Sequence, residues 1–216
     1  MSSLRVRYQT IEFDDVDIHV RTLRDNQQYS DDEGVAEKLG ISSATWPIFG
    51  VVWDSGRVLA YHMLKFEIKG KRILEVGCGI ALASLVLNQR LADITSTDYH
   101  PEAENFLLEN IRLNKGKHIP FVRTGWLDGN DTLGMFDLII GSDVLYERDH
   151  VDLLADFIQQ HTKHHCEVII VDPGRCQRGG FSRKMSALGF SHIRSSPPQG
   201  SYLSQPFRGQ ILCYTR

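Results

Sequence analysis

The sequence has little cysteine and no cysteine framework. Its 216 residues contain four cysteines, Cys78, Cys166, Cys176 and Cys213, and none forms a Cys-x-x-Cys pair. Such a sparse set excludes a disulfide-stapled scaffold and is typical of proteins from a reducing compartment. We therefore expect a cytoplasmic protein.

Long apolar runs and a large charge excess are also missing. No apolar stretch approaches the length of a membrane span, and the first residues alternate polar and apolar side chains, unlike a signal peptide. The net charge is −3, with 24% charged residues, whereas dedicated nucleic-acid binders carry a strong basic excess. We expect no membrane association and do not favour a nucleic-acid partner.

Two common nucleotide-binding loops are absent. The sequence holds no G-x-x-x-x-G-K-[ST] segment, which argues against an ATP or GTP phosphate loop. The dinucleotide fingerprint G-x-G-x-x-G would need a third glycine where Leu82 stands. The second mismatch counts against NAD and FAD.

What is present is a glycine turn between a buried strand and a helix. The apolar segment 72–76 suits a central parallel strand, and Gly77 and Gly79 follow it. Glycines there permit a sharp turn and the close approach of a ligand that a Cβ would exclude. A helix expected over 80–90 would point its first amides at that ligand. Asp98 ends the next strand, where a carboxylate can accept both hydroxyls of a ribose.

The rest of the chain predicts one α/β domain. Strands and helices alternate from Lys71 onward, which favours βαβ units and a parallel sheet with helices on both faces. A short helix is expected within 32–39. The expected strands are 72–76, 93–98, 119–124, 136–140, 167–171, 190–195 and 209–215, and the expected longer helices are 53–65, 80–90, 101–115, 150–162 and 180–188. The last two strands form a closing antiparallel pair.

The N-terminal region predicts a β-hairpin. Residues 4–8 and 16–20 alternate polar and apolar side chains, with Asp14-Asp15 near the turn. We divide the chain into an N-terminal extension, residues 1–45, and a main domain over 46–216.

The glycine turn resembles the cofactor loop of class I S-adenosylmethionine methyltransferases, which have a Rossmann-like seven-stranded sheet. The resemblance rests on Glu75-Val76-Gly77-Cys78-Gly79 together with Asp98. One departure is Ala81, at a position where glycine is frequent. The resemblance implies S-adenosylmethionine as the cofactor and S-adenosylhomocysteine as the product.

A second segment narrows the resemblance. Phe136–Tyr146 contains Asp143-Val144-Leu145-Tyr146, which resembles the D-x-x-Y motif of the protein lysine methyltransferases called methyltransferase family 16. Gly50–Ala60, with its Val-Trp-Asp, matches the same family. The resemblance implies methyl transfer to a protein lysine, with Asp143 and Tyr146 as the catalytic residues facing the substrate. The residues implied at the cofactor are Trp53, Glu75, Gly77, Cys78, Gly79, Asp98, Trp126 and Ser142.

Several residues allow a second interpretation. Trp126 could stack on the adenine or close the rim of the core. Asp143 could cap a following helix, with Tyr146 as a packing residue. Arg175, together with Arg178, could contact an acidic substrate or the cofactor carboxylate, or could lie on a plain exposed turn.

The histidine-rich segment 161–165 invites a metal interpretation. It lacks carboxylate or cysteine partners at ligand spacing. We expect a solvated helix end there and no metal.

Two other functions stay open. A class I enzyme could methylate a nitrogen or oxygen of a small molecule, and a non-catalytic domain of this fold could serve as an interaction module. Methylation of a nucleic-acid base is disfavoured because Ser142–Leu145 stands where an Asn-Pro-Pro-Tyr motif would lie. The substrate and the oligomeric state are left open.

Overall fold

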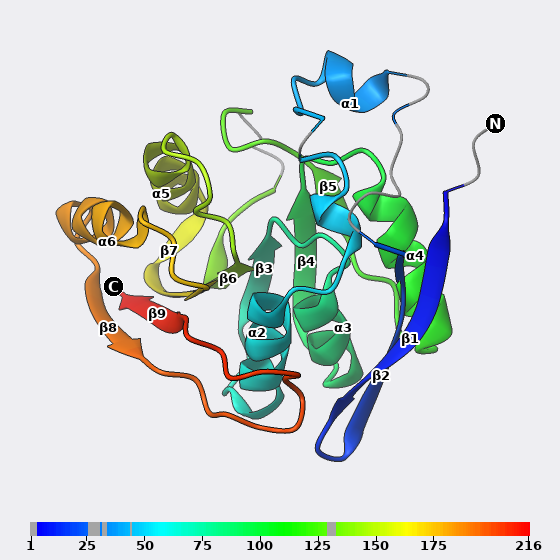
Figure 1. Cartoon of the computed structure of the whole chain (residues 1–216). Coiled ribbons are helices and arrows are strands. Elements are labelled where there is room, and N and C mark those ends of the chain that lie inside the picture. The colour runs from blue at the N-terminus through cyan, green and yellow to red at the C-terminus, as the bar shows by residue number, and fades with distance from the viewer. Residues whose placement is uncertain (1–3, 26–30, 32–33, 44, 129–132) are drawn as a thin grey trace.

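The computed structural model describes residues 4–25, 31, 34–43, 45–128 and 133–216 (Figure 1). At its centre is a seven-stranded sheet with the order β5-β4-β3-β6-β7-β9-β8. The strands are β3 Arg72–Val76, β4 Asp93–Asp98, β5 Phe121–Arg123, β6 Phe136–Ser142, β7 Thr162–Asp172, β8 Ser191–Ser195 and β9 Gln210–Thr215. All pairs from β5 to β7 are parallel, and β9 runs antiparallel to both of its neighbours. The predicted sheet and its closing antiparallel pair are confirmed.

Helices cover both faces of the sheet (Figure 1). The helices that pack on the sheet are α2 Asp54–Lys65, α3 Leu82–Gln89, α4 Ala103–Leu113, α5 His150–His161 and α6 Arg178–Ala187. Two short elements precede them in the chain, α1 Val35–Lys38 and η1 Ile48–Gly50 (a 3₁₀ turn). Successive residues of β3 belong to two hydrophobic clusters on opposite faces of the sheet. Ile73 packs in the cluster with α2, α3 and α4, while Leu74 packs in the cluster with α5 and α6. This period of two is what a sheet covered on both faces requires.

The strand order reverses next to β3. β4 and β5 extend the sheet to one side of β3, and β6 and β7 extend it to the other. In open α/β sheets, ligands bind beyond the carboxyl ends of the strands at such a reversal. The loops that follow β3 and β6 therefore lie at the position favoured for a site.

Several boundaries differ from the prediction, and two of the differences are explained by specific contacts. α4 begins at Ala103, and Pro101 lies in the preceding turn, where the ring of His100 accepts the Glu102 N–H at 3.1 Å. β7 begins at Thr162, five residues before the predicted start, because Thr162 pairs with Phe136 across an irregular register. In the segment 161–165, expected to be a solvated helix end, His161 does end α5 but is buried, and the exposed residues 163–165 lie on β7.

The N-terminal region forms the predicted hairpin, with β1 Val6–Phe13 and β2 Val16–Leu23 paired antiparallel around a turn at Asp14. Its inner face packs into the same hydrophobic cluster as α3 and α4. The start of the predicted short helix, at 32–33, lies outside the described residues, and its remainder contains α1. The boundary between residues 45 and 46 stays a prediction.

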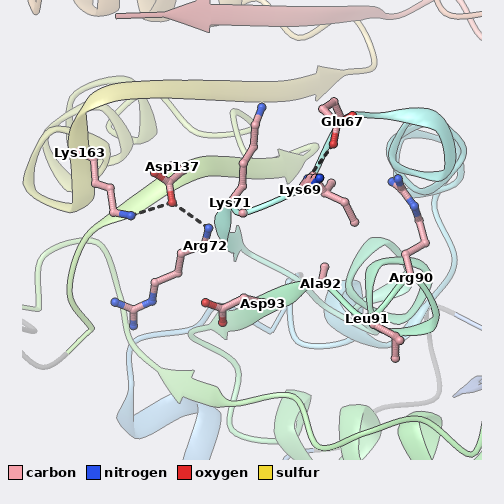
Figure 2. A pocket seen from close by; sticks show the side chains of 12 residues that line it. Glu67, Lys69, Lys71, Arg72, Arg90, Leu91, Ala92, Asp93, Asp137 and Lys163 are labelled. Carbon is pink, nitrogen blue, oxygen red and sulfur yellow. Dashed lines mark hydrogen bonds and ion pairs between the residues drawn. The ribbon is translucent and has the colours of Figure 1, made fainter.

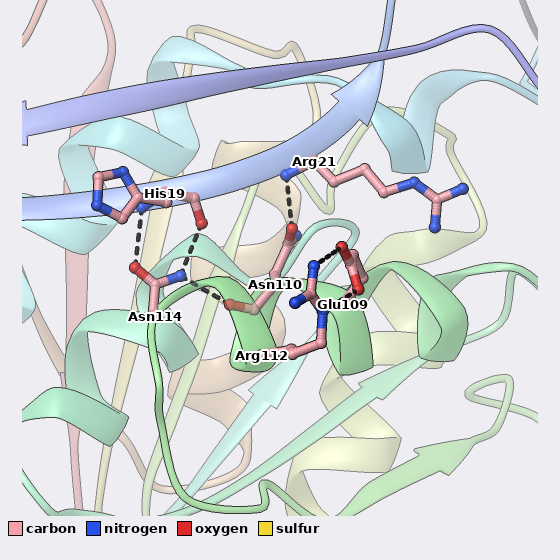
Figure 3. A network of polar contacts seen from close by, with 6 residues as sticks. All are labelled: His19, Arg21, Glu109, Asn110, Arg112 and Asn114. Atoms are coloured by element: carbon pink, nitrogen blue, oxygen red, sulfur yellow. Dashed lines mark hydrogen bonds and ion pairs between the residues drawn. The ribbon is translucent and has the colours of Figure 1, made fainter.

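Asn110 of α4 and Asn114, the C-cap of that helix, join the hairpin to the domain (Figure 3). Asn110 Oδ1 accepts the Arg21 N–H at 2.6 Å, and Asn110 Nδ2 donates to the Ile80 carbonyl at 3.2 Å. Asn114 accepts the N–H of His19 and donates to its carbonyl, at 2.9 and 2.6 Å. The fully buried Asn110 thus connects the hairpin to the glycine loop.

Over the described residues, the helices are too short or too polar for any of them to cross a membrane.

Candidate functional site

A cavity of about 900 Å³ lies at the carboxyl ends of β3, β4 and β6. All the residues predicted to hold the cofactor or face the substrate line it: Trp53, Glu75, Gly77, Cys78, Gly79, Asp98, Trp126, Ser142, Asp143 and Tyr146. These residues come from segments up to 93 positions apart in the sequence, from 53 to 146. The fold therefore brings the whole predicted set to one place.

The glycine loop needs glycine at both positions. Gly77 and Gly79 have φ angles of 58° and 54°, in the left-handed region that side chains rarely adopt. A Cβ on Gly79 would lie 2.8 Å from the carbonyl oxygen of Phe49, and a Cβ on Gly77 would lie 2.9 Å from Cγ1 of Val144. The loop is thus held between η1 and the segment after β6.

Ala81, the one departure from the resemblance, has the backbone conformation of a glycine. It is the N-cap of α3 and has a φ of 60°, so it occupies a conformation that glycine adopts without strain. Its N–H donates to the Cys78 carbonyl at 2.7 Å, and its own carbonyl accepts the Leu85 N–H at 2.9 Å. These bonds hold the alanine in the left-handed conformation.

Asp98 is fixed by the backbone around it. Its Oδ2 accepts the N–H of Gly79 and its Oδ1 accepts the N–H of His100, each at 2.8 Å. Burial raises the pKa of Asp98, and these hydrogen bonds oppose the rise. Because each carboxylate oxygen has two lone-pair sites, both retain acceptor capacity toward the cavity.

Glu75 has a structural role that sequence reasoning did not identify. Its Oε2 accepts the N–H of Ser84 at 2.9 Å and also the Ser84 hydroxyl, and Ser96 donates to that hydroxyl at 2.7 Å. Ser84 is in the first turn of α3, where a carboxylate is favourable. Burial raises the pKa of Glu75 to about 7. Glu75 therefore links β3 to the start of α3 while lining the cavity.

Three aromatic rings form a row along one wall. His150 contacts Trp126 edge to face, with 4.9 Å between ring centroids, and contacts Tyr146 in the same way at 4.5 Å. Trp126 packs against the hydrophobic cluster and also lines the cavity, so both sequence interpretations describe part of its position. Burial raises the pKa of Tyr146 to about 12, so its hydroxyl is protonated at neutral pH.

Sequence reasoning missed several lining residues. His150 follows Tyr146 by four positions, Tyr99 follows Asp98 directly, and Phe49 belongs to the apolar loop before Trp53. Tyr99 could have been suspected from its neighbour. His150 and Phe49 carry no such signal, because only the tertiary structure brings them to the cavity.

The loop before α2 forms another wall. Trp53 donates its indole N–H to the Ile48 carbonyl at 2.9 Å. Phe49 stacks on His100 with 3.8 Å between ring centroids. The bond and the stack connect η1 to Trp53 on one side and to the segment after β4 on the other.

Asp143 forms an ion pair that the sequence did not predict. Arg175 Nε donates to Asp143 Oδ1 at 2.7 Å, and Arg175 Nη2 donates to Asp143 Oδ2 at 2.8 Å. The helix-cap interpretation of Asp143 is wrong, because the next helix begins at His150 with Asp149 as its N-cap. The alternatives for Arg175, an exposed turn or a ligand contact, both omitted this partner.

A second hollow, of about 730 Å³, lies at the amino ends of β3 and β4 (Figure 2). Four of its basic side chains, those of Lys71, Arg72, Arg90 and Lys163, have partners within the chain. Lys163 and the Arg72 N–H both bind Asp137, at 2.7 and 2.8 Å, and Lys71 pairs with Glu167. This hollow is at the opposite edge of the sheet from the glycine loop, so we place the functional site at the carboxyl ends.

The described part of the chain contains no group of three or more His, Cys, Asp or Glu side chains arranged to hold a metal. His164 and His165 lie on β7, and the buried His161 has Nδ1 2.9 Å from the Gly134 carbonyl oxygen.

Known proteins resemble the chain in sequence. Residues 37–181 match the model of a family described as "Lysine methyltransferase". The electron transfer flavoprotein beta subunit lysine methyltransferase of Xenopus laevis is 30% identical over 135 residues, 61% of this chain and 54% of that protein. The protein N-lysine methyltransferase METTL21A of Danio rerio is 35% identical over 115 residues, 48% of this chain and 52% of that protein. The chain thus spans about half the length of these relatives.

The fold also matches a solved structure. Magnesium protoporphyrin IX methyltransferase from Synechocystis PCC 6803, crystallised with bound S-adenosylmethionine, gives a TM-score of 0.60 at 16% identity. The match covers 87% of this chain and 98% of that one. The family model covers more than half of the sequence. The chain therefore belongs to the lysine methyltransferase family, within the class I fold that uses S-adenosylmethionine, as its motifs predicted.

Proposed function

We propose that this chain transfers a methyl group from S-adenosylmethionine to a lysine side chain of another protein. The observation that carries the proposal is the placement of Asp143 and Tyr146 in the same cavity as the glycine loop and Asp98. A site for the methyl acceptor then adjoins a site for the methyl donor.

The residues present fit the cofactor. Gly77 and Gly79 leave room where a Cβ would collide with neighbouring atoms, and Asp98 offers a fixed carboxylate to the ribose hydroxyls. Trp126 offers an aromatic surface to the adenine. Ser142, next to Gly56, lies on the wall between α2 and β6. When bound, S-adenosylmethionine supplies a methyl group carried on a sulfonium, which is a good leaving group.

The acceptor must be deprotonated before it can react. With an ordinary lysine pKa of about 10.4, losing the proton at pH 7 costs about 4.6 kcal/mol. Asp143 and the neutral Tyr146 hydroxyl can orient the amine, while its proton passes to water. The lysine nitrogen then forms the new N–C bond with its lone pair as the C–S bond breaks, and the sulfur keeps the electrons as S-adenosylhomocysteine leaves. Alignment of the nucleophile is the main contribution that such a site makes.

A protein substrate is favoured over a small molecule by two observations. The relatives named above are protein lysine methyltransferases. The cavity is also lined by large side chains that remain exposed, Trp53 at 39%, Tyr146 at 42% and Leu127 at 79%. Exposed apolar groups gathered at one opening are typical of protein interaction sites.

We also propose that the protein works in the cytoplasm. All four cysteines are free thiols, and Cys78 lines the cofactor cavity. Fractionation of cells that produce the protein, followed by immunoblotting, tests this location. Recovery in an oxidising compartment would contradict it.

Methyl transfer into a cell lysate tests the function. The purified chain is incubated with radiolabelled S-adenosylmethionine and lysate, and the labelled product is identified by mass spectrometry. We expect label on a lysine of a protein, with loss of transfer in Asp143→Ala and a rate lower by up to about 100-fold in Tyr146→Phe, since the hydroxyl only orients the amine. Both variants should still bind S-adenosylhomocysteine.

Three other results would contradict the proposal. Label found only in small metabolites would favour the small-molecule enzyme. No thermal stabilisation by saturating S-adenosylhomocysteine would favour a non-catalytic module. Undiminished transfer by Asp143→Ala would remove that residue from the acceptor site.

A further inference from the structure

The carboxylate that should meet the substrate amine already has a cationic partner. Arg175 donates to both oxygens of Asp143, at 2.7 and 2.8 Å, in the parallel geometry of a bidentate pair. The Asp143 side chain is 14% exposed and that of Arg175 is 45% exposed. The pair is therefore open to the cavity on the arginine side.

Both partners are held in place by the backbone. The N–H of Asp143 donates to the Val171 carbonyl at 2.9 Å, which ties the end of β6 to β7. The N–H groups of Gly174 and Arg175 both donate to Oδ1 of the buried Asp172, at 2.8 and 2.9 Å. The turn after β7 is thus shaped so that Arg175 reaches back to Asp143. This arrangement identifies the pair as a built part of the site.

The ion pair changes what Asp143 can do to an amine. An isolated carboxylate a few ångströms from a lysine favours the ammonium form, which cannot attack a methyl group. A guanidinium bound to that carboxylate cancels most of its charge, because arginine stays protonated at any pH of interest. The other charged or titratable groups facing the pair or its neighbours include Asp98, Tyr146, Glu147, Asp172 and Arg178, and His150, which contacts the Tyr146 ring.

We propose that Arg175 is a positioning residue that neutralises Asp143, so that the site orients the lysine amine without holding it as ammonium. The inference rests on the lysine methylation proposed above and adds to its acceptor site a residue that controls the charge of Asp143. Asp143 sets the direction of approach, and Arg175 limits the attraction between its carboxylate and the ammonium.

A specific kinetic pattern follows. Removing the guanidinium should strengthen binding of the ammonium form, so KM should not rise. The amine should then lose its proton less easily, so the pKa that governs the low-pH side of the kcat profile (its acidic limb) should rise. For each unit of that rise, kcat at pH 7 should fall about tenfold. A residue with only a structural role would lower stability without moving that limb.

The test uses the lysate protein that the wild-type chain labels. Initial rates of transfer of the radiolabelled methyl group are measured from about pH 6 to pH 10 for the wild type, Arg175→Gln and Arg175→Lys. Arg183→Gln is a matched control, because it removes an exposed positive charge on α6 from a residue that does not line the cavity. Binding of S-adenosylhomocysteine verifies that each variant is folded, and Arg175→Met replaces the glutamine variant if that one does not fold.

We expect Arg175→Gln to shift the acidic limb of the kcat profile to higher pH by one pH unit or more, with an unchanged or lower KM. Arg175→Lys should restore most of the profile, and Arg183→Gln should match the wild type. An unshifted limb in Arg175→Gln, or a loss confined to KM, would overturn the role of Arg175. If the wild-type chain labels no protein at all, the proposed function fails instead.

Discussion

The backbone N–H of Gly79 donates a 2.8 Å hydrogen bond to Oδ2 of Asp98. This bond joins the loop after β3 to the end of β4, so the two most informative features of the sequence form one structural unit. Asp98 therefore shapes the glycine loop and also offers its carboxylate to the cofactor.

The double role of Asp98 can be separated by substitution. Asp98→Ala removes the acceptor for the Gly79 and His100 N–H groups and for the ribose hydroxyls. We expect binding of S-adenosylhomocysteine to weaken on the order of 100-fold or more, since a hydrogen bond to a charged group contributes about 1.5–3 kcal/mol. Isothermal titration calorimetry measures the affinity. Asp98→Asn is the matched control, because it keeps one acceptor oxygen and should bind better than Asp98→Ala. Equal affinities of wild type and Asp98→Ala would contradict the ribose role.

Gly79→Ala should destabilise the protein through collision as well as backbone strain. The added Cβ would lie 2.8 Å from the Phe49 carbonyl oxygen, and overpacking of this kind costs about 1–3 kcal/mol. Gly70→Ala is a suitable control, because Gly70 has a φ of 72° and nothing within 4 Å of its Cβ position. Urea denaturation should show a greater loss for Gly79→Ala. A loss no larger than that of Gly70→Ala would mean that η1 moves aside without cost.

Asn110→Ala should weaken both the fold and cofactor binding. The substitution leaves the Arg21 N–H (Figure 3) and also the Ile80 carbonyl without their partner, and each unsatisfied buried group costs about 1–3 kcal/mol. The free energy of unfolding from denaturant titration measures the first effect and a thermal shift with S-adenosylhomocysteine the second. Asn114→Ala, whose bonds to His19 are exposed, should cost less. Equal losses would show that burial of Asn110 does not set the energetics.

Glu75 should make stability depend on pH. Its pKa is raised from 4.5 to about 7 in the folded protein, so between these values the folded state holds more protons than the unfolded chain. The stability contributed by protonated Glu75 is therefore present at low pH and is lost as the pH rises toward 7. Against Glu75→Gln, the wild type should lose up to about 3 kcal/mol across this window.

Denaturant unfolding at several pH values, with both proteins side by side, measures this difference. Other titrating groups, including His100 with its pKa lowered to about 4 by burial, contribute to both proteins and cancel. A constant difference from pH 4.5 to 7 would show that Glu75 stays ionised in its contact with Ser84.

Local patterns predicted most of the fold. The alternating apolar residues of β1 and β2 and the continuous apolar run of β3 each determine a strand from nearby residues alone. The start of β7 was missed because Thr162 pairs with Phe136, and a pairing partner distant in sequence leaves no local pattern. Pro101 was placed inside α4, but the preceding turn closes on the His100 ring and delays the helix to Ala103.

The sequence by itself determined the α/β class, the cofactor loop at Gly77 and Gly79, and the ribose-binding candidate Asp98. These are short-range features, in which residue type and spacing directly limit the backbone. Only the tertiary structure decided that Glu75 anchors α3, that His150 lies between Trp126 and Tyr146, and that Arg175 binds Asp143. Each of those contacts joins residues from different segments, which meet because the loops and helices after β3, β5, β6 and β7 lie together at the carboxyl ends of the strands.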